Sequence, residues 1–598
     1  MELDHSSVHD VIHPTAAFAQ SPPGPVDTLE ARHELRSWLD SQLNPKNRID
    51  RLDPPANPLW RIDGCTALGT QFYAIPVFLT EDFPPLRFDV FIAESEATSN
   101  PVFRQLLDLS VAFHTKDATR LNRLGITKHV LRILQAWTQK EAAAASNPDS
   151  FASGFEAYPF GSHIILENLD LDISKVKVTI AKTFYLERQL LALSELPAAL
   201  GIEPGVVPPD IDIFRLSIVQ QLHDSVCVVR IRDSEDDTRW IFKALTSGTK
   251  FLYCELRNLL RMEPHPNVIS KPKYLVTKNC AFGNKEGVVG FIVPYHSAGS
   301  LRDALPLLRI HNQLTPHKQM TWAKQLASAV LHIRERGNMF YPDLRLDNVV
   351  RSATDDLVMV DFEQRGVWCE FAAPEINAVS YVHILATDGQ DREEDDPTCI
   401  PVEKREYFSN ILSRVLPEWK ALEASEDYNN LDFNGGTTFN VPWMALDARE
   451  QEAAEVYMLA RVLWCIFEGQ CAPQNAAVWQ SYKREPEYEF PEYRHTPPGI
   501  RDLIDQCTKG RRATLSSLVT RVGGKLLLRT ETGVKEDSTA EEVRSAAKEF
   551  WKGEVWFAVE FLKYRDKAKA SGTWDSNSFG RPRLREVVER LEELSKNL

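Results

Sequence analysis

Apolar residues recur at helical spacing in several segments of the chain. Between residues 322 and 336 they return every three or four positions, the spacing that gives a helix one buried face. The same spacing predicts a helix over 29–43, and Thr28 directly before it can serve as the N-cap. Further helices are expected over 101–113, 127–145, 181–196 and 551–561. The aromatic stripe of the last segment is more typical of a buried helix face than of a binding surface.

Shorter apolar runs between these helices predict strands. Two of them cover 72–79 and 86–92 and are separated by the turn-forming sequence TEDFPP. A third apolar run covers 162–173. Strands mixed with helices in this way predict an α+β domain over residues 29–200.

Composition marks both ends of this first domain. Residues 1–28 carry Pro, Ser and Ala without periodicity and are predicted to be a disordered lead-in. Residues 201–212 contain three prolines and two glycines. Because proline removes the amide donor that a strand or helix needs, this stretch is predicted to be a linker.

Charge and cysteine content exclude several classes of protein. The 84 acidic and 69 basic side chains give a net charge of −15, which argues against a protein that coats nucleic-acid phosphates. No apolar stretch approaches the ~20 residues that a membrane span needs. The first residues lack the pattern of a secretory leader, so a cytoplasmic or nuclear location is expected. Nine cysteines without a CxxC pair favour neither a disulfide framework nor a zinc ribbon.

Candidate chemistry is concentrated in two short phrases on either side of an apolar strand. The first is DLRLDN over residues 343–348, and the second is DFE over residues 361–363. Asp343 lies five positions before Asn348 and eighteen before Asp361. Phosphoryl transfer needs such groups, because a carboxylate must orient the attacking hydroxyl while Asp and Asn oxygens hold Mg²⁺.

Further phrases accompany this pair. Lys243 lies in the strand-like sequence RWIFKAL, and Glu255 follows twelve positions later on a helical stretch. GFIVPYHSAGSL covers 290–301, APE covers 373–375 and EVYMLA covers 455–460. In this order the phrases resemble the protein kinase superfamily, in which the catalytic loop has the form HRDLKxxN and the metal-binding turn the form DFG.

The resemblance implies a bilobal protein-kinase-like fold over residues 213–598, so the fold class expected for the whole chain is α+β. A small, strand-rich N-lobe would cover 213–296, and a large helical C-lobe would cover 297–598. The C-lobe would carry two insertions, at about 376–450 and 510–570.

The resemblance also implies a role for each residue of these phrases. Asp343 stands at the position of the catalytic base, and Arg345 stands where kinases usually place a lysine near the γ-phosphate. Lys243 and Glu255 would form the ion pair that binds the nucleotide phosphates. ATP and Mg²⁺ are the implied cofactors. The remaining implied ligands are Asn348 and Asp361 for the metal, and Val293 and Tyr295 of the hinge strand for the nucleotide.

One departure from the kinase pattern concerns the loop that covers the phosphates. No glycine occurs from Val206 to Ser247, and LHDSV stands where a glycine-rich loop is expected. Glycines there let backbone amides approach the phosphates closely. Asp224 in their place would repel phosphate unless a metal or His223 compensates. In the catalytic loop, Tyr341-Pro342 replaces the usual His-Arg.

The segment after the second phrase departs as well. Glu363 replaces the glycine of DFG, which reduces the freedom of the backbone. Only thirteen residues separate Asp361 from Glu375, and none is Ser, Thr or Tyr, so this segment cannot be activated by phosphorylation. So short a segment leaves little platform for an extended peptide. The sequence leaves open whether Arg512 or Arg581 pairs with Glu375.

Three functions are open on this reading. The first is an ATP- and Mg²⁺-dependent Ser/Thr protein kinase. The second is a pseudokinase that serves as a scaffold or binding module, favoured by the missing glycines, and the third is a kinase-like small-molecule phosphotransferase. LHDSV, FYPDLRLDNVV and VDFEQRG also resemble a group of fungal kinase-like proteins with an extra N-terminal domain. The expected partner is a protein substrate or binding partner, and neither nucleic acid nor a membrane.

Overall fold

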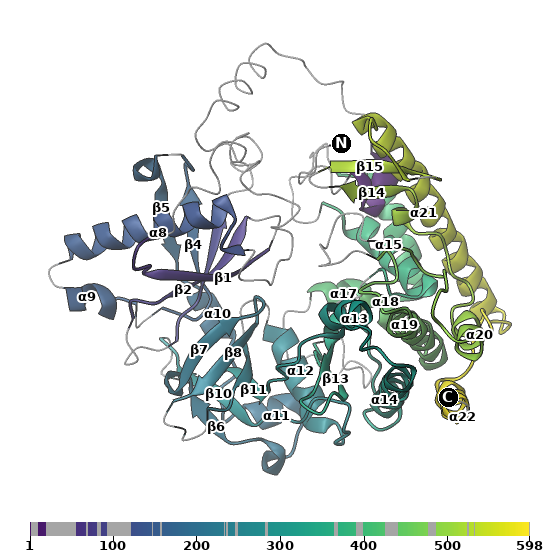
Figure 1. Cartoon of the computed structure of the whole chain (residues 1–598), viewed down its shortest axis with the longest axis horizontal. Coiled ribbons are helices and arrows are strands. Elements are labelled where there is room, and N and C mark those ends of the chain that lie inside the picture. The colour runs from purple at the N-terminus through teal and green to yellow at the C-terminus, as the bar shows by residue number, and fades with distance from the viewer. Residues whose placement is uncertain are drawn as a thin grey trace.

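The structure of the chain, a computed structural model, describes Met1, residues 10–19 and most of residues 55–596. Within 55–596 the description leaves out 67–69, 80–84, 93–120, 146–147, 156–157, 171, 233, 235–236, 245–248, 282–284, 364–368, 390–398, 425–439, 476–485, 523–524 and 532. The helices expected over 29–43 and 101–113 lie outside the described residues. Those that are described combine helices with four β-sheets, in agreement with the α+β class (Figure 1). None of the described helices is both long and apolar enough to cross a membrane.

The first sheet is built from residues 60–181. Its strands lie in chain order, and neighbours are antiparallel except β3 and β4, which are parallel. A parallel pair requires a crossover connection, and α8 (Gly125–Ala144) lies within it. The Trp60 indole donates to Thr138 Oγ1 at 2.7 Å, which fastens α8 to the first strand. The strands are β1 (Trp60–Thr66), β2 (Gln71–Pro76), β3 (Phe88–Ile92), β4 (Ser162–Glu167) and β5 (Lys177–Ala181).

Strands β2 and β3 and helix α8 confirm the elements expected over 72–79, 86–92 and 127–145. The single helix expected over 181–196 is wrong. The chain forms two short helices instead, α10 (Phe184–Gln189) and α11 (Leu196–Leu200), with a non-helical stretch between them. The backbone amides of that stretch donate elsewhere. Leu191 N donates to Tyr253 Oη of α12 (Thr249–Arg261) at 2.8 Å, and Leu193 N donates to Glu286 O of β11 (Glu286–Pro294) at 3.0 Å.

The border between the first domain and the rest of the chain also differs from the prediction. Leu186, Leu196 and Leu200 pack in the same hydrophobic core as the second sheet, so the first domain does not extend to residue 200. The linker expected over 201–212 is wrong at its end, because Asp210–Asp212 forms β6 and pairs in parallel with β10. Sequence periodicity indicates that this region contains helix, but it does not identify the hydrophobic core that the helices join.

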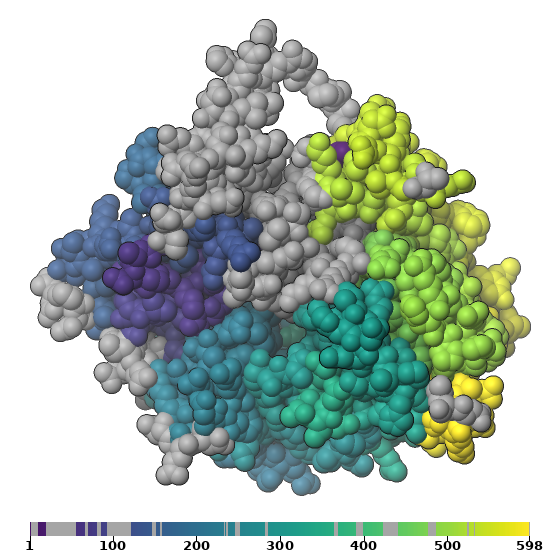
Figure 2. Space-filling view, in the orientation of Figure 1, coloured from purple at the N-terminus to yellow at the C-terminus, as the bar shows by residue number. Residues whose placement is uncertain are grey.

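The second sheet has six strands in the order β6-β10-β11-β9-β8-β7. Helix α12 (Thr249–Arg261) follows β9, and its apolar residues share the core of this sheet. Figure 2 shows the purple and blue residues of the first sheet packed against the blue-green residues of the second. The strands after β6 are β7 (Leu216–Gln221), β8 (Val226–Ile231), β9 (Trp240–Ala244), β10 (Tyr274–Asn279) and β11 (Glu286–Pro294).

A large helical region follows the second sheet along the chain. Its central helix, α19 (Ala448–Glu468), is buried on all sides from residue 453 onward, as expected for a helix enclosed by others. A short hairpin of β12 (Val349–Arg351) and β13 (Leu357–Met359) lies beside α14. The other helices are α13 (Leu301–Ile310), α14 (Pro316–Glu335), α15 (Pro374–Thr387), α16 (Val402–Val415), α17 (Trp419–Ala424), α18 (Val441–Met444), α20 (Pro498–Cys507), α21 (Ala540–Ala570) and α22 (Leu584–Ser595).

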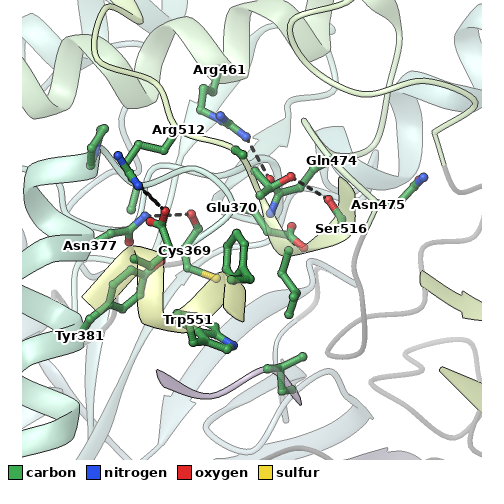
Figure 3. A pocket seen from close by; sticks show the side chains of 18 of the residues that line it. Cys369, Glu370, Asn377, Tyr381, Arg461, Gln474, Asn475, Arg512, Ser516 and Trp551 are labelled. Atoms are coloured by element: carbon green, nitrogen blue, oxygen red, sulfur yellow. Dashed lines mark hydrogen bonds and ion pairs between the residues drawn. The ribbon is translucent and has the colours of Figure 1, made fainter. Parts of the chain in front are cut away.

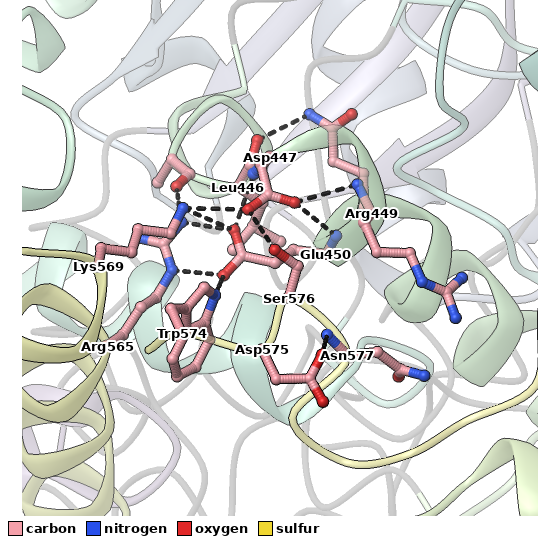
Figure 4. Close-up of polar contacts among 12 residues, drawn as sticks. Leu446, Asp447, Arg449, Glu450, Arg565, Lys569, Trp574, Asp575, Ser576 and Asn577 are labelled. Atoms are coloured by element: carbon pink, nitrogen blue, oxygen red, sulfur yellow. Dashed lines mark hydrogen bonds and ion pairs between the residues drawn. The ribbon is translucent and has the colours of Figure 1, made fainter. Parts of the chain in front are cut away.

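The two segments expected as insertions pack on each other. Helix α15 contacts both α16 and the 31-residue α21. The sheet of β14 (Val519–Val522), β15 (Lys525–Thr530) and β16 (Gly533–Lys535) also contacts α21. Arg565 Nε of α21 donates to Glu450 Oε1 at 2.6 Å, and the Trp574 indole donates to the same oxygen at 2.9 Å (Figure 4). These buried contacts tie α21 to the first turn of α19.

The N-terminal residues are part of this packing. The short 3-10 helix Pro14–Phe18 lies against α15 and α21, and the Trp551 indole donates to Val11 O at 2.8 Å. The amino group of Met1 donates to Leu526 O at 3.0 Å. A disordered lead-in over 1–28 is therefore wrong for Met1 and residues 10–19. Composition alone did not reveal that their small apolar side chains fit the buried face of α21.

The arginine that pairs with Glu375 is Arg581. Its Nη2 donates to Glu375 Oε2 at 3.1 Å, and its Nη1 donates to Oε1. Both side chains are almost wholly buried. The alternative, Arg512, instead donates to Glu554 Oε1 at 2.8 Å and keeps 34% of its side chain exposed.

Replacing Arg581 should cost far more stability than replacing Arg512. Arg581→Met leaves the Glu375 carboxylate buried without its cation, which costs about 3–5 kcal/mol. Arg512→Met should cost less, because Arg512 is 34% exposed and water can take its place beside Glu554, whose side chain is 10% exposed. Urea unfolding of the two variants beside the unmodified chain measures both losses. Equal losses would contradict the assignment of Arg581.

Candidate active site

A buried lysine joins three distant parts of the chain. Lys243 lies on β9, Glu255 on α12, and Asp361 two positions after β13. Lys243 Nζ donates to both carboxylate oxygens of Glu255, each at 2.7 Å, and to Asp361 Oδ1 at 2.7 Å. The ion pair expected between Lys243 and Glu255 is formed, and Asp361 completes it as a triad.

The surroundings of Lys243 and Glu255 explain why both charges lie in the core. Lys243 occupies the buried end of β9, opposite the fully buried Phe291 of β11. Glu255 shares its helix with buried Leu252 and Leu256. Once this strand and helix pack together, neither charge can reach bulk water, so each depends on an opposite charge within hydrogen-bonding distance.

Lys243 and Asp361 keep their charges at neutral pH, whereas burial raises the pKa of Glu255 above its ordinary value. Burial by itself would lower the pKa of Lys243, but the carboxylates of Asp361 and Glu255 raise that pKa above its ordinary value. Burial would likewise raise the pKa of Asp361, and the ammonium of Lys243 holds it below its ordinary value. Lys243 is therefore a cation and Asp361 an anion in the folded protein.

The backbone at Asp361 is held in an uncommon conformation. Its φ of 70° lies in the left-handed region, which non-glycine residues adopt rarely and often at functional sites. The next residue is fixed from two sides, since Phe362 N donates to Glu255 Oε1 at 2.9 Å and Phe362 O accepts from Asn258 Nδ2 at 3.2 Å. Glu255 thus orients both Lys243 and the turn that carries Asp361.

The DLRLDN phrase forms a compact loop beside the triad. Asp343 Oδ2 accepts from Arg345 Nε and from Asn348 Nδ2, both at 3.0 Å. Asn348 Nδ2 also donates to Asp343 O at 3.0 Å. Burial raises the pKa of Asp343 to about 6, although Arg345 opposes this shift. Asp343 and Asp361 are close enough for each charge to raise the proton affinity of the other.

Glu455 supports this loop from the central helix. Its Oε1 accepts from Tyr341 N at 2.9 Å, and its Oε2 accepts from Arg334 Nη1 at 2.8 Å. The Tyr341 hydroxyl donates to Val360 O, just before Asp361. Burial raises the pKa of Glu455 to about 7, despite the nearby arginine. The backbone on both sides of the apolar strand is therefore anchored to α19.

The oxygen atoms of the site suit a hard divalent cation. Glu255, Asp361 and Glu363 each place one carboxylate oxygen within 4.8 Å of the others. Asn348 uses its amide nitrogen on Asp343, and its amide oxygen accepts no hydrogen bond from the residues that the structure describes. Carboxylate and amide oxygens are the ligands that Mg²⁺ prefers in proteins. Asp361 and Asn348, the expected metal ligands, therefore fit the ion chemically.

The loop 222–225 connects β7 to β8 in place of a glycine-rich turn. The Asp224 carboxylate accepts from Ser225 N at 2.7 Å and pairs with His223 Nδ1, so it is occupied within its own loop. Gln221 Nε2 donates to Asp224 O at 3.3 Å. His223 adds to the lowering of the Asp361 pKa, after the larger contributions of burial and Lys243. The Asp224 carboxylate is thus engaged by its own loop, and the His223 imidazole lies near the triad.

The first sheet braces the strand that leads into this loop. The register of β7 against β8 shifts between Ile218 and Gln220. Around this bulge, Gln221 N donates to Asp63 Oδ2 at 2.8 Å and Val219 O accepts from Arg61 Nη2 at 3.1 Å. Arg61 and Asp63 also pair with each other at 2.7 Å. Sequence reasoning missed both residues, although two opposite charges at positions i and i+2 of one strand share a face.

The other predicted residues lie around the triad. Val293 is buried in β11 and faces Ile241 of β9, and Tyr295 directly follows the last residue of β11. Arg345 contacts Asp343 and, more distantly, Asp347 Oδ2 at 3.9 Å.

Comparisons with known proteins add no family assignment: neither a scan against family models nor a search of curated proteins gave a match. The chemistry of the site is therefore inferred from its own groups. The site combines the buried Lys243 ammonium with the carboxylates of Asp343 and Asp361 and the amide oxygen of Asn348. Together these groups can bind a polyphosphate with a divalent metal.

The raised pKa of Glu455 predicts a pH-dependent difference in stability. The ordinary value is 4.5 and the folded-state value about 7, so the stabilising contribution is complete below pH 4.5 and is lost as the pH rises through 7. Over this range the unmodified chain should lose about 3 kcal/mol relative to Glu455→Gln, which cannot ionise. Urea unfolding of both proteins from pH 4.5 to 8 measures the difference. Parallel stability curves would contradict the shift.

Proposed function

We propose that the chain is an ATP- and Mg²⁺-dependent phosphotransferase of the protein kinase type, which transfers phosphate to Ser or Thr hydroxyls of a protein. The single observation that supports this best is the Lys243–Glu255–Asp361 triad, with all three contacts at 2.7 Å. A buried charge pair that serves only the fold needs two residues, here Lys243 and Glu255. The third residue, Asp361, belongs to the phrase that carries a metal ligand in the family that the chain resembles.

Each group has a distinct task in this proposal. Lys243 would hold the nucleotide phosphates, and Glu255 keeps the ammonium in place. Asp361 and Asn348 would bind Mg²⁺, which supplies neutralisation of the charge on the phosphates. Asp343 would accept a hydrogen bond from the acceptor hydroxyl and take up its proton. Its pKa of about 6 leaves it ionised at neutral pH yet basic enough to receive a proton.

The proposed architecture has two lobes. The six-stranded sheet with α12 would form the smaller lobe, and the helical region around α19 would form the larger lobe. Val293 and Tyr295, at the end of β11, would lie on the adenine side of the cleft between them. Arg345 would face the γ-phosphate from the catalytic loop.

A second candidate is a pseudokinase that serves as a binding module. The observation that favours it is the loop 222–225, which has no glycine and is fixed by its own side chains and by Asp63. A loop of this kind offers fewer free amides to phosphate. A small-molecule acceptor is a third candidate, because the segment between Asp361 and Glu375 is only thirteen residues long.

Transfer of labelled phosphate separates these candidates. With Mg²⁺ and ATP, the unmodified chain should label itself or a mixed protein substrate. Asp343→Asn and Asp361→Asn should each reduce the rate by about 10²–10⁴-fold, because they remove the proton acceptor and a metal ligand.

Asp355→Asn is the matched control. Asp355 lies in the hairpin between Asp343 and Asp361, where it pairs with Lys318 and Arg351 at 2.8 and 2.9 Å, and it should leave the rate unchanged. Turnover of small hydroxyl compounds without protein labelling would favour the third candidate. Equal labelling by all four proteins would contradict the proposal, and no labelling by any of them would favour the pseudokinase.

A further inference from the structure

A cavity lies away from the triad, among elements of the helical region. Its volume is about 100 Å³, and it is enclosed by the start of α15, by α19, by residues 512–516 and by α21 (Figure 3). Ile12 of the N-terminal segment closes one side. The segments that form its wall are distant in sequence, so the cavity exists only in the folded chain.

The notable group in this cavity is the Arg461 guanidinium. The side chain lies on α19, and Arg461 is only 4% exposed. Its Nη1 donates to Tyr457 Oη at 3.3 Å and its Nη2 to Gln474 Oε1 at 3.4 Å, both long contacts with neutral acceptors. Its Nε has no hydrogen-bond partner in the described part of the chain. No carboxylate oxygen of the described residues lies within 4.0 Å of its nitrogens.

Four of the five other buried arginines in the described part of the chain are treated differently. Arg87, Arg302, Arg565 and Arg581 each contact a carboxylate oxygen at 3.0 Å or less. Arg461 has instead the face of the Phe490 ring, 4.9 Å from the guanidinium carbon. A ring face offsets only part of the cost of removing a cation from water. Among the described residues, no carboxylate therefore neutralises the buried charge of Arg461 by direct contact.

The rest of the lining favours an anion with several acceptor oxygens. The charge of Glu554 is met by Arg512 at 2.8 Å, so this second arginine adds a donor without adding net charge. Glu370 also lines the cavity, and its carboxylate would repel an anion, so the Arg461 guanidinium must outweigh this repulsion. The neutral lining groups with amide N–H donors are Asn377, Gln474 and Asn475, whereas the Ser516 hydroxyl donates to Glu489 Oε2 at 3.2 Å.

We infer that this cavity binds a tetrahedral oxyanion of the phosphate type, with the Arg461 guanidinium as its main contact. A planar guanidinium suits phosphate because its parallel N–H groups can reach two oxygens at once. The cavity wall includes Cys369 and Glu370, which lie between Asp361 and Glu375. Binding there would fix this segment against α19 and α21. The inference does not depend on the proposed phosphotransferase activity.

Thermal unfolding in inorganic phosphate tests the inference. In a buffer without phosphate, at constant ionic strength set with chloride, added phosphate should raise the Tm of the full chain progressively, as mass action requires. Arg461→Met should abolish this rise. The same variant, without phosphate, should be at least as stable as the unmodified chain, because it removes an uncompensated buried charge.

Two variants control for other sites. Lys243→Met should keep the phosphate-dependent rise, which separates this cavity from the triad, and Arg590→Met should keep it because Arg590 is an exposed residue of α22. O-phosphoserine is a second probe: an equal rise shows that the cavity accepts a phosphate ester, and a rise with inorganic phosphate alone shows that it takes the free ion. An unchanged rise in Arg461→Met, or no rise in the unmodified chain, would overturn the inference.

Discussion

The interaction on which the site depends is the burial of the Lys243 ammonium between two carboxylates. Removing three charges from water costs several kcal/mol for each ion, and only short contacts among all of them offset that cost. Because Lys243, Glu255 and Asp361 come from a strand, a helix and a turn, their pairing fixes the second sheet relative to the β12–β13 hairpin. The contacts that stabilise the fold therefore also place the Lys243 ammonium beside Asp361, a potential metal ligand.

The helical region positions the other half of the site through buried acids of its own. Glu455 of α19 holds the backbone at Tyr341, just before the loop that carries Asp343, and Glu375 at the start of α15 is held by Arg581. Glu450 joins α19 to α21 through Arg565. Each of these carboxylates meets an arginine. Arg461 differs, because no carboxylate of the described residues contacts it.

Sequence reasoning predicts one contact of the site better than it predicts the borders of the fold. The ion pair of Lys243 and Glu255 follows from the kinase resemblance and is formed, whereas the contact between Lys243 and Asp361 is not predicted, because only the folded chain brings the two residues together. Sequence periodicity does not predict the break between α10 and α11. It indicates which positions are buried, but it does not identify the hydrophobic core in which they are buried. Arg61 and Asp63 were missed for the same reason: their partner is the bulged strand β7, which only the tertiary structure identifies.

The central claim is that the triad is a nucleotide and metal site rather than a structural charge cluster. Titration of ATP into the full chain by calorimetry, with Mg²⁺ and then with EDTA, tests it most directly. The account predicts binding that weakens at least tenfold without Mg²⁺, that loses this metal dependence in Asp361→Asn, and that disappears in Lys243→Met. The same affinity with and without metal in all three proteins, or no binding by the unmodified chain, would contradict it.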